Sequence, residues 1–76
     1  MTESERYLIL IEGGPPSNYG AWSPEVPGCV ATGGTVEECV KEMRGALACH
    51  FELMREYGEA IPEPGGGGIY VAHTAA

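Results

Sequence analysis

The sequence predicts a small α+β domain with the order β-β-β-α-β, in which a single helix packs across a sheet. A continuous apolar run near the N-terminus is typical of a central strand. A capped amphipathic segment in the second half of the chain indicates one long helix. Further short runs of β-forming residues lie between prolines and glycines, before and after that helix. The 76 residues allow one domain, spanning 1–76.

The first three strands are expected to form an antiparallel meander, because turn-forming residues separate them. An acidic lead-in over residues 1–5 precedes Tyr7–Ile11, which is apolar throughout and is expected to be a central strand covered on both faces. Tyr19–Trp22 and Cys29–Thr32 are the second and third strands. Ile69–His73 is the fourth strand, which joins the sheet after the helix.

A single helix is expected over Val36–Tyr57, where apolar residues recur at helical spacing and form one stripe. Thr35 and Glu38 form a capping box. In it the Thr35 side chain accepts from the Glu38 amide, and the Glu38 carboxylate accepts from the Thr35 amide. Gly58 is the expected stop. The proline- and glycine-rich segment 59–68 then serves as a crossover back to the sheet.

The charge balance indicates the kind of partner. Four basic and eleven acidic residues leave a net charge of −7, which opposes direct nucleic-acid binding and favours a basic partner, while also serving solubility. A core of this size rarely supplies more than about 3–5 kcal/mol, so a homodimer or higher homo-oligomer is expected. The acidic N-terminus has no signal-peptide pattern, and no apolar run is long enough to span a bilayer. We therefore expect a cytoplasmic protein that does not contact membranes.

Candidate reactive and metal-binding side chains are few. The cysteines Cys29, Cys39 and Cys49 form no CxxC pair and are expected to be reduced and mostly buried. Cys49 and His50 are adjacent and point about 100° apart on a helix, so they cannot chelate together. Cys39 lacks a base, His50 is interpreted as a core histidine rather than a switch, and His73 as a surface residue. The sequence therefore predicts no catalytic residue, no metal site and no cofactor.

A turn near the edge of the predicted sheet carries the candidate binding residues. Tyr19, Trp22, Glu25 and Pro27 bring aromatic rings, a carboxylate and a rigid proline close together. Aromatic residues in such a setting are favoured anchors of protein interfaces. Gly28 permits the turn itself. The alternative for Trp22 is that its ring fills the core.

Four pieces of the chain together resemble the HicB family of antitoxins. Residues 23–39, Ser-Pro-Glu-Val-Pro-Gly-Cys-Val-Ala-Thr-Gly-Gly-Thr-Val-Glu-Glu-Cys, are similar to the family's Pro-Asp-Leu-Pro-Gly-Cys turn, Gly-Asp-Thr and Glu-Glu-Ala helix start. The leading strand Tyr7–Ile11 and the Gly58–Pro64 stretch, which is similar to Gly-x-x-Ile-Pro-x-Pro, extend the resemblance over most of the chain. The resemblance implies a degenerate RNase H-like fold, and dimers or larger assemblies. It also implies that the chain neutralises a small basic mRNA interferase of HicA type by binding over its active site.

The chain departs from the family pattern in two ways. Glu25 and Gly34 stand where the family has aspartates, which keeps one charge and removes the other. Family members continue into a DNA-binding domain, whereas this chain stops after the fourth strand, so operator binding through its own domain is not expected. We expect a non-catalytic antitoxin that occludes its toxin with an acidic surface. The alternatives are a solo oligomeric scaffold without a toxin, and a residual metal-dependent nuclease using Glu12, against which the missing aspartates argue.

Overall fold

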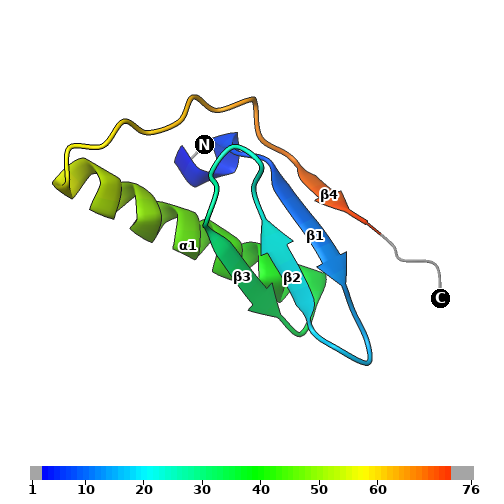
Figure 1. The fold of residues 1–76 in the computed structure, drawn as a ribbon. Coiled ribbons are helices and arrows are strands. Elements are labelled where there is room, and N and C mark those ends of the chain that lie inside the picture. Colours follow the sequence, from blue (N-terminus) through cyan, green and yellow to red (C-terminus); the bar gives the residue numbers. More distant parts are fainter. Residues whose placement is uncertain (1–2, 73–76) are drawn as a thin grey trace.

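The computed structural model describes residues 3–72 and shows one helix packed on a four-stranded sheet (Figure 1). The predicted order β-β-β-α-β is confirmed, and a short 3₁₀ helix, which was not predicted, lies at the end of the acidic lead-in. The elements are η1 (Glu3–Arg6), β1 (Ile9–Gly13), β2 (Tyr19–Trp22), β3 (Val30–Gly33), α1 (Val36–Glu56) and β4 (Ile69–Val71).

The strands are arranged in the order β3-β2-β1-β4. β1 pairs antiparallel with β2, and β2 pairs antiparallel with β3, so these three strands form the predicted meander. β4 lies on the other side of β1 and runs parallel to it, because α1 and the crossover 59–68 first carry the chain back along the sheet. β1 is therefore central, as its apolar run predicts, and β3 and β4 are the edges.

Two strands begin later than predicted. β1 starts at Ile9, and Tyr7 contacts the helix and the crossover instead of pairing in the sheet. Its ring packs against Phe51 of α1 with the centroids 4.7 Å apart, and its hydroxyl donates a hydrogen bond to the Pro62 carbonyl oxygen. β3 starts at Val30, one residue after the predicted start. The apolar N-terminal run is thus shared between the strand and a contact that ties the crossover to the core.

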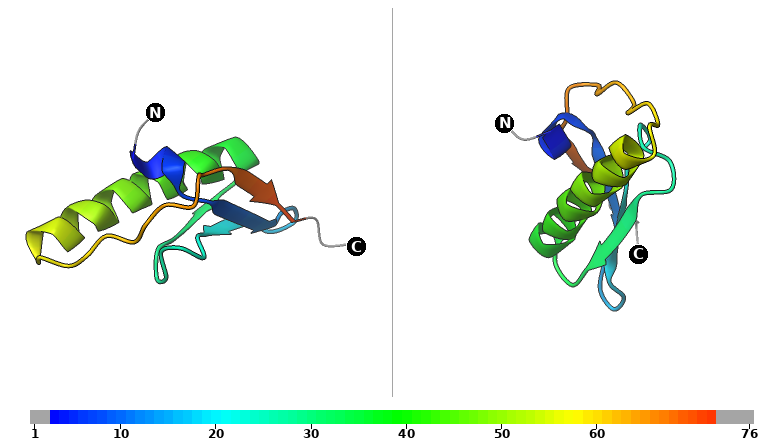
Figure 2. Two further views of the ribbon diagram at one scale, coloured as in Figure 1. Left: turned by 90° about the horizontal axis from the view of Figure 1, so that it is seen from above. Right: turned by 90° about the vertical axis from the view of Figure 1, so that its left-hand side faces the viewer.

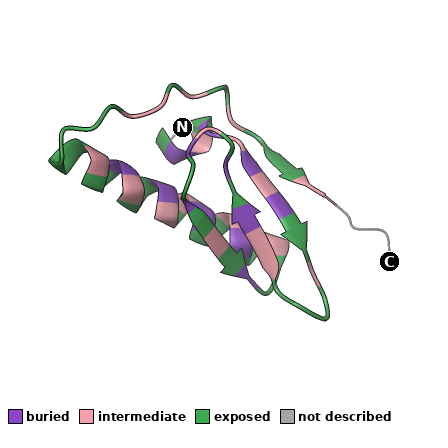
Figure 3. Cartoon of the chain, in the orientation of Figure 1, coloured by how far each residue is buried: buried purple, intermediate pink, exposed green. Residues whose placement is uncertain are grey.

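The hydrophobic core lies between α1 and one face of the sheet (Figure 3). Successive residues of a strand point to opposite faces, and the buried residues of β1 and β2 follow that alternation. The buried residues of α1 recur every four residues, which agrees with the predicted apolar stripe. The core side chains of these three elements are Ile9, Ile11, Ala21, Cys39, Met43, Leu47 and Phe51.

The last turns of α1 extend beyond the sheet, and part of the predicted stripe is exposed there (Figure 2). Tyr57, the last residue of the predicted stripe, is exposed over 73% of its surface. Leu53, which the predicted stripe does not include, is also exposed. His50 is half-buried and meets the Phe51 ring edge-on, with the centroids 6.4 Å apart. The interpretation of His50 as a core histidine is therefore wrong, because His50 lies at the side of the buried stripe and the adjacent Phe51 fills the core instead.

Both ends of α1 are capped. At the N-terminus, Thr35 Oγ1 accepts a hydrogen bond from the Glu38 amide at 3.0 Å. The Glu38 carboxylate accepts from the Gly34 amide at 3.2 Å, not from the Thr35 amide as predicted, and so it satisfies the donor that precedes the cap. At the C-terminus, Gly58 has a φ of 70° and its amide donates to the Arg55 carbonyl, which completes the turn that ends the helix.

α1 covers one face of the sheet, and no helix or strand within residues 3–72 covers the other (Figure 2). Leu8 and Leu10, which alternate with the buried Tyr7, Ile9 and Ile11, are half-buried. The prediction that the first strand is covered on both faces is therefore wrong. A single helix makes a two-layer domain, which leaves the second face of the sheet open.

Candidate protein-binding face

A row of four apolar side chains crosses the open face of the sheet, one from each strand. Leu10 of β1 pairs with Trp22 of β2 and with Tyr70 of β4, and Trp22 pairs with Val30 of β3. Paired residues of neighbouring strands point to the same face, so the four side chains lie side by side. We call Val30, Trp22, Leu10 and Tyr70 the apolar row.

The apolar row is strongly exposed. Val30 is 68% exposed, Tyr70 63% and Trp22 41%, while Leu10 at the centre is half-buried. The open face of an antiparallel sheet usually carries polar residues, and adjoining exposed apolar side chains mark interaction sites. The apolar row is therefore a candidate binding face, and the alternative that Trp22 fills the core is wrong.

A shallow hollow lies beside the apolar row. The adjacent cross-strand row consists of Glu12, Gly20 and Thr32, which are in register across β1, β2 and β3. Gly20 has no side chain, and a Cβ at this position would meet no atom within 4 Å. The hollow has a volume of about 610 Å³, and its lining includes Glu12, Trp22, Val30 and Thr32.

Within residues 3–72 the four strands place one charged side chain on the open face, and that side chain is acidic. Glu12 is the single charged residue of the four strands. Within residues 3–72 no ion pair involves it. The basic residues of the chain lie on η1 and α1, and they are Arg6, Lys41, Arg44 and Arg55.

Two of the four predicted binding residues share a surface. Trp22 and Pro27 line a hollow of about 380 Å³ at one end of the apolar row, together with Pro24 and Val30. Tyr19 lies at the other end of β2 and packs against the core on the side of α1. The prediction that all four residues lie close together is wrong. Tyr19 and Trp22 are the first and last residues of β2, and the alternation of side chains along the strand turns them to opposite faces of the sheet.

Glu25, the fourth predicted binding residue, is used inside the molecule. Its carboxylate accepts a hydrogen bond from the Leu8 amide at 2.7 Å, just before β1 begins. The same carboxylate lies against the crossover at Gly65, where any Cβ would collide with it. Gly28, with a φ of 88°, turns the chain after Pro27. Glu25 therefore ties the turn to β1 and to the crossover instead of facing solvent.

The two buried cysteine thiols, Cys29 and Cys39, are not activated as nucleophiles. Burial raises the pKa of the Cys39 thiol, and the Glu38 carboxylate raises it further. Burial also raises the pKa of the Cys29 thiol, with a smaller contribution from Cys49. A catalytic thiol needs the opposite shift. Cys49 is exposed on α1, so two of the three cysteines within the described residues are buried. The remaining candidate, the predicted surface residue at position 73, lies outside the described residues.

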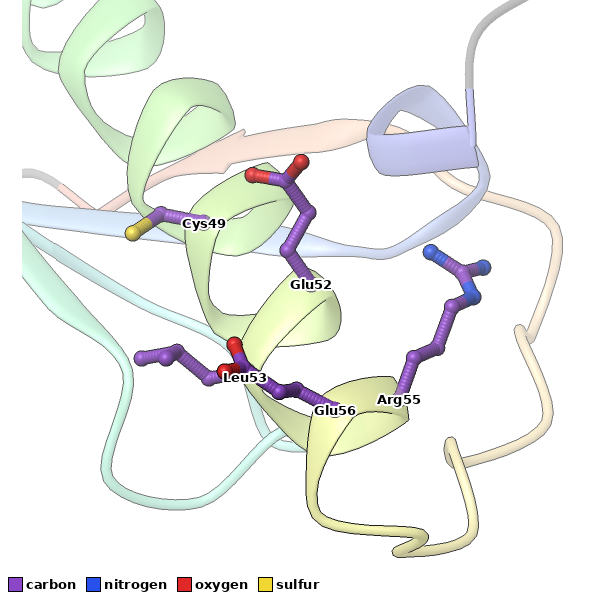
Figure 4. A pocket seen from close by; sticks show the side chains of 5 residues that line it. All are labelled: Cys49, Glu52, Leu53, Arg55 and Glu56. Carbon is purple, nitrogen blue, oxygen red and sulfur yellow. The ribbon is translucent and has the colours of Figure 1, made fainter.

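A hollow on the outer surface of α1 holds no convergent set of groups (Figure 4). Figure 4 shows its side chains spreading outward from the helix instead of pointing to one centre. Within residues 3–72, no three His, Cys, Asp or Glu side chains are placed to hold a metal ion. In the same part of the chain, the helices are too short or too polar to cross a membrane. The residues that line the hollow are Cys49, Glu52, Leu53, Arg55 and Glu56.

Apart from Trp22, the apolar row was not predicted from the sequence. One signal was available. Every residue of Tyr7–Ile11 is apolar, so the side chains on both faces of this strand are apolar. The prediction assigned the second face to another layer of the same domain. Val30 and Tyr70 gave no separate signal, since each belongs to a short strand whose register is set by its neighbours.

A two-layer domain whose open sheet face carries exposed apolar side chains has a surface typical of protein-binding modules. The family model described as HicB_like antitoxin of bacterial toxin–antitoxin systems matches residues 7–73, and the chain belongs to this family. The structure is similar to the crystal structure of the Burkholderia pseudomallei antitoxin HicB, with 32% sequence identity and a TM-score of 0.64. That match covers 70% of this chain and 40% of the length of the other. A comparison with curated proteins gives no match.

Proposed function

We propose that this chain is an antitoxin that neutralises a small basic mRNA interferase of HicA type by covering the surface on which the toxin binds RNA. The observation that supports the proposal is the exposed apolar row on a strongly acidic member of an antitoxin family. The apolar row supplies area that a partner can bury. The net charge of −7 favours the approach of a basic partner.

Neutralisation of this kind is steric and electrostatic. An enzyme that cleaves mRNA has to hold phosphates with basic groups, and an acidic protein seated there competes with the RNA. The antitoxin needs no reactive group of its own for this role, and we place the activity in the cytoplasm. Trp22 and Pro27, which share the hollow at the end of the apolar row, are the proposed contacts from the predicted set.

Co-expression with a basic mRNA interferase of HicA type from the same organism tests the proposal. We expect growth to be rescued and a complex to be purified, and we expect the complex to weaken as the salt concentration is raised. The same toxin expressed with an unrelated acidic protein of similar size serves as the control for charge alone. The proposal is refuted if no complex forms and growth is not rescued.

A solo oligomeric scaffold is the second candidate function, because a second copy can also cover an exposed apolar row. Sedimentation of the purified chain, alone and with the toxin, separates the two candidates. The scaffold requires a stable homo-oligomer that the toxin does not alter. The antitoxin requires a new species that contains both proteins.

A further inference from the structure

The hollow on the open face owes its shape to one missing side chain. Gly20 lies between Glu12 of β1 and Thr32 of β3, in register with both. Its position would accept a Cβ without contact, so the floor of the hollow is backbone. Trp22 lies two residues further along β2 and lines the same hollow. A side chain from outside can therefore lie across Gly20, between the indole ring and the carboxylate.

The lining of the hollow selects a long basic side chain. Trp22 and Val30 offer apolar surface for a hydrocarbon stem, and Glu12 offers a negative charge for a cationic end group. A cation over an indole ring is also attracted by the ring electrons. Arginine suits this combination better than lysine, because a planar guanidinium stacks on the ring and can donate two hydrogen bonds to one carboxylate.

No basic side chain of the described residues lines this hollow, and Lys41 lines a separate hollow on the α1 side of β3. α1, which carries three of the four basic residues, covers the opposite face of the sheet. Arg55 pairs with Glu3, and Arg44 donates to the Ser4 carbonyl oxygen at 3.1 Å. A second copy is a poor source because it also carries a net charge of −7, and charges of the same sign oppose association. A basic partner surface supplies both the cation and the attraction.

The geometry points to the hollow between Trp22 and Glu12 as the receptor for one arginine of the toxin, docked across Gly20 while the apolar row packs against the surrounding surface. This inference rests on the proposed function and names the contact through which the acidic antitoxin recognises its basic partner. Glu12 supplies the charge, Trp22 the stacking surface and Gly20 the space.

Two substitutions test the hollow, and each has a matched control. Glu12→Gln removes the charge at constant size. Gly20→Leu fills the hollow, and it is sterically tolerated because nothing lies within 4 Å of a Cβ there. The controls are Glu56→Gln and Gly45→Leu on α1, where Gly45 also has open space. Calorimetry measures the affinity of each variant for a catalytically inactive form of the HicA-type toxin that the wild-type chain binds.

We expect Glu12→Gln and Gly20→Leu each to weaken toxin binding by at least about tenfold, and the two controls to change it by less than about twofold. A double-mutant cycle identifies the partner group. The loss caused by Glu12→Gln should disappear when the docked arginine of the toxin has already been replaced by glutamine. Far-UV circular dichroism shows that each variant is folded, and Glu12→Gln decides the outcome if Gly20→Leu does not fold.

The failure of this inference differs from the failure of the proposed function. If the wild-type chain binds the toxin and Glu12→Gln binds equally well, the inference is overturned and the proposed function stands. If the wild-type chain does not bind the toxin, both fall. If the wild-type chain forms a homo-oligomer and both Glu12→Gln and Gly20→Leu dissociate it, a second copy occupies the hollow, and the inference is again overturned.

Discussion

Replacing Gly33 by alanine tests how closely β3 packs on the first turn of α1. A Cβ at Gly33 would lie 2.6 Å from the Cys39 amide nitrogen and 2.8 Å from the Cys39 Cα. Ordinary Cβ contacts begin at 3.4 Å, so β3 and α1 would have to separate by about 0.8 Å. Both neighbouring atoms belong to the helix backbone, and neither can rotate away as a side chain would.

The expected loss is large for a domain of this size. Overpacking an interior costs about 1–3 kcal/mol, and backbone neighbours place this substitution near the upper end, at about 2.5 kcal/mol. A domain this small rarely has more than about 3–5 kcal/mol of stability. Because 1 kcal/mol shifts Tm by about 4–8 °C in domains of 60–100 residues, we expect Gly33→Ala to lower Tm by about 10–20 °C.

Gly34→Ala is the matched control, because a Cβ at Gly34 meets no atom within 4 Å. Neither glycine has a positive φ, so alanine suffers no backbone strain at either position. We expect Gly34→Ala to keep or slightly raise Tm, since alanine restricts the unfolded chain. Thermal unfolding followed by far-UV circular dichroism measures both variants. Equal Tm values would refute the close approach of β3 to α1.

Three further substitutions test single contacts. Thr35→Ala removes the oxygen that accepts from the Glu38 amide, and it should lower the free energy of unfolding, measured in urea, by about 1 kcal/mol. Thr35→Ser keeps a hydroxyl and should retain most of that stabilisation. Equal losses in the two variants would contradict the cap. Burial raises the pKa of the Tyr7 phenol above its ordinary 10.0, so the native protein holds a proton that the unfolded chain releases, and stability falls as the pH rises above about 10. Thermal melts of Tyr7→Phe should show a smaller fall, and an unchanged pH dependence would count against this account. Ser23→Ala removes a buried hydroxyl without a hydrogen-bond partner within residues 3–72, and Tm should stay constant or rise; a loss above about 1 kcal/mol would show that the hydroxyl is bonded.

The long helix was predicted to within one residue, because its signals are local. The apolar period, the cap at Thr35 and the stop at Gly58 each involve residues within one or two turns of one another. One hydrogen bond of the helix cap differs from the prediction. The Glu38 carboxylate bonds Gly34 where a capping box predicts Thr35. The strands were located to within two residues, since short β-forming runs mark an element better than they mark its ends.

Trp22 is the one residue of the candidate binding face that was predicted from the sequence. Trp22 was predicted to be an interface anchor because aromatic residues beside a rigid turn are typical of interfaces, and the structure places it on the open face. Glu25 was expected to face the partner, yet it bonds the Leu8 amide, a donor that lies 17 positions away in the chain. Tyr19 was expected beside Trp22, but strand alternation turns it toward α1. Each of these differences comes from a contact between distant segments.

The sequence by itself determined the order of the elements, the capped helix and the acidic charge, because these depend on neighbouring residues or on composition alone. The tertiary structure decided which face of the sheet is covered and which residues share the open one. The apolar row and the hollow over Gly20 exist because strand register brings Glu12, Gly20 and Thr32 into one line and sets Trp22 beside them. Register and the number of layers are properties of several segments at once, so no single segment of this chain encodes its binding face.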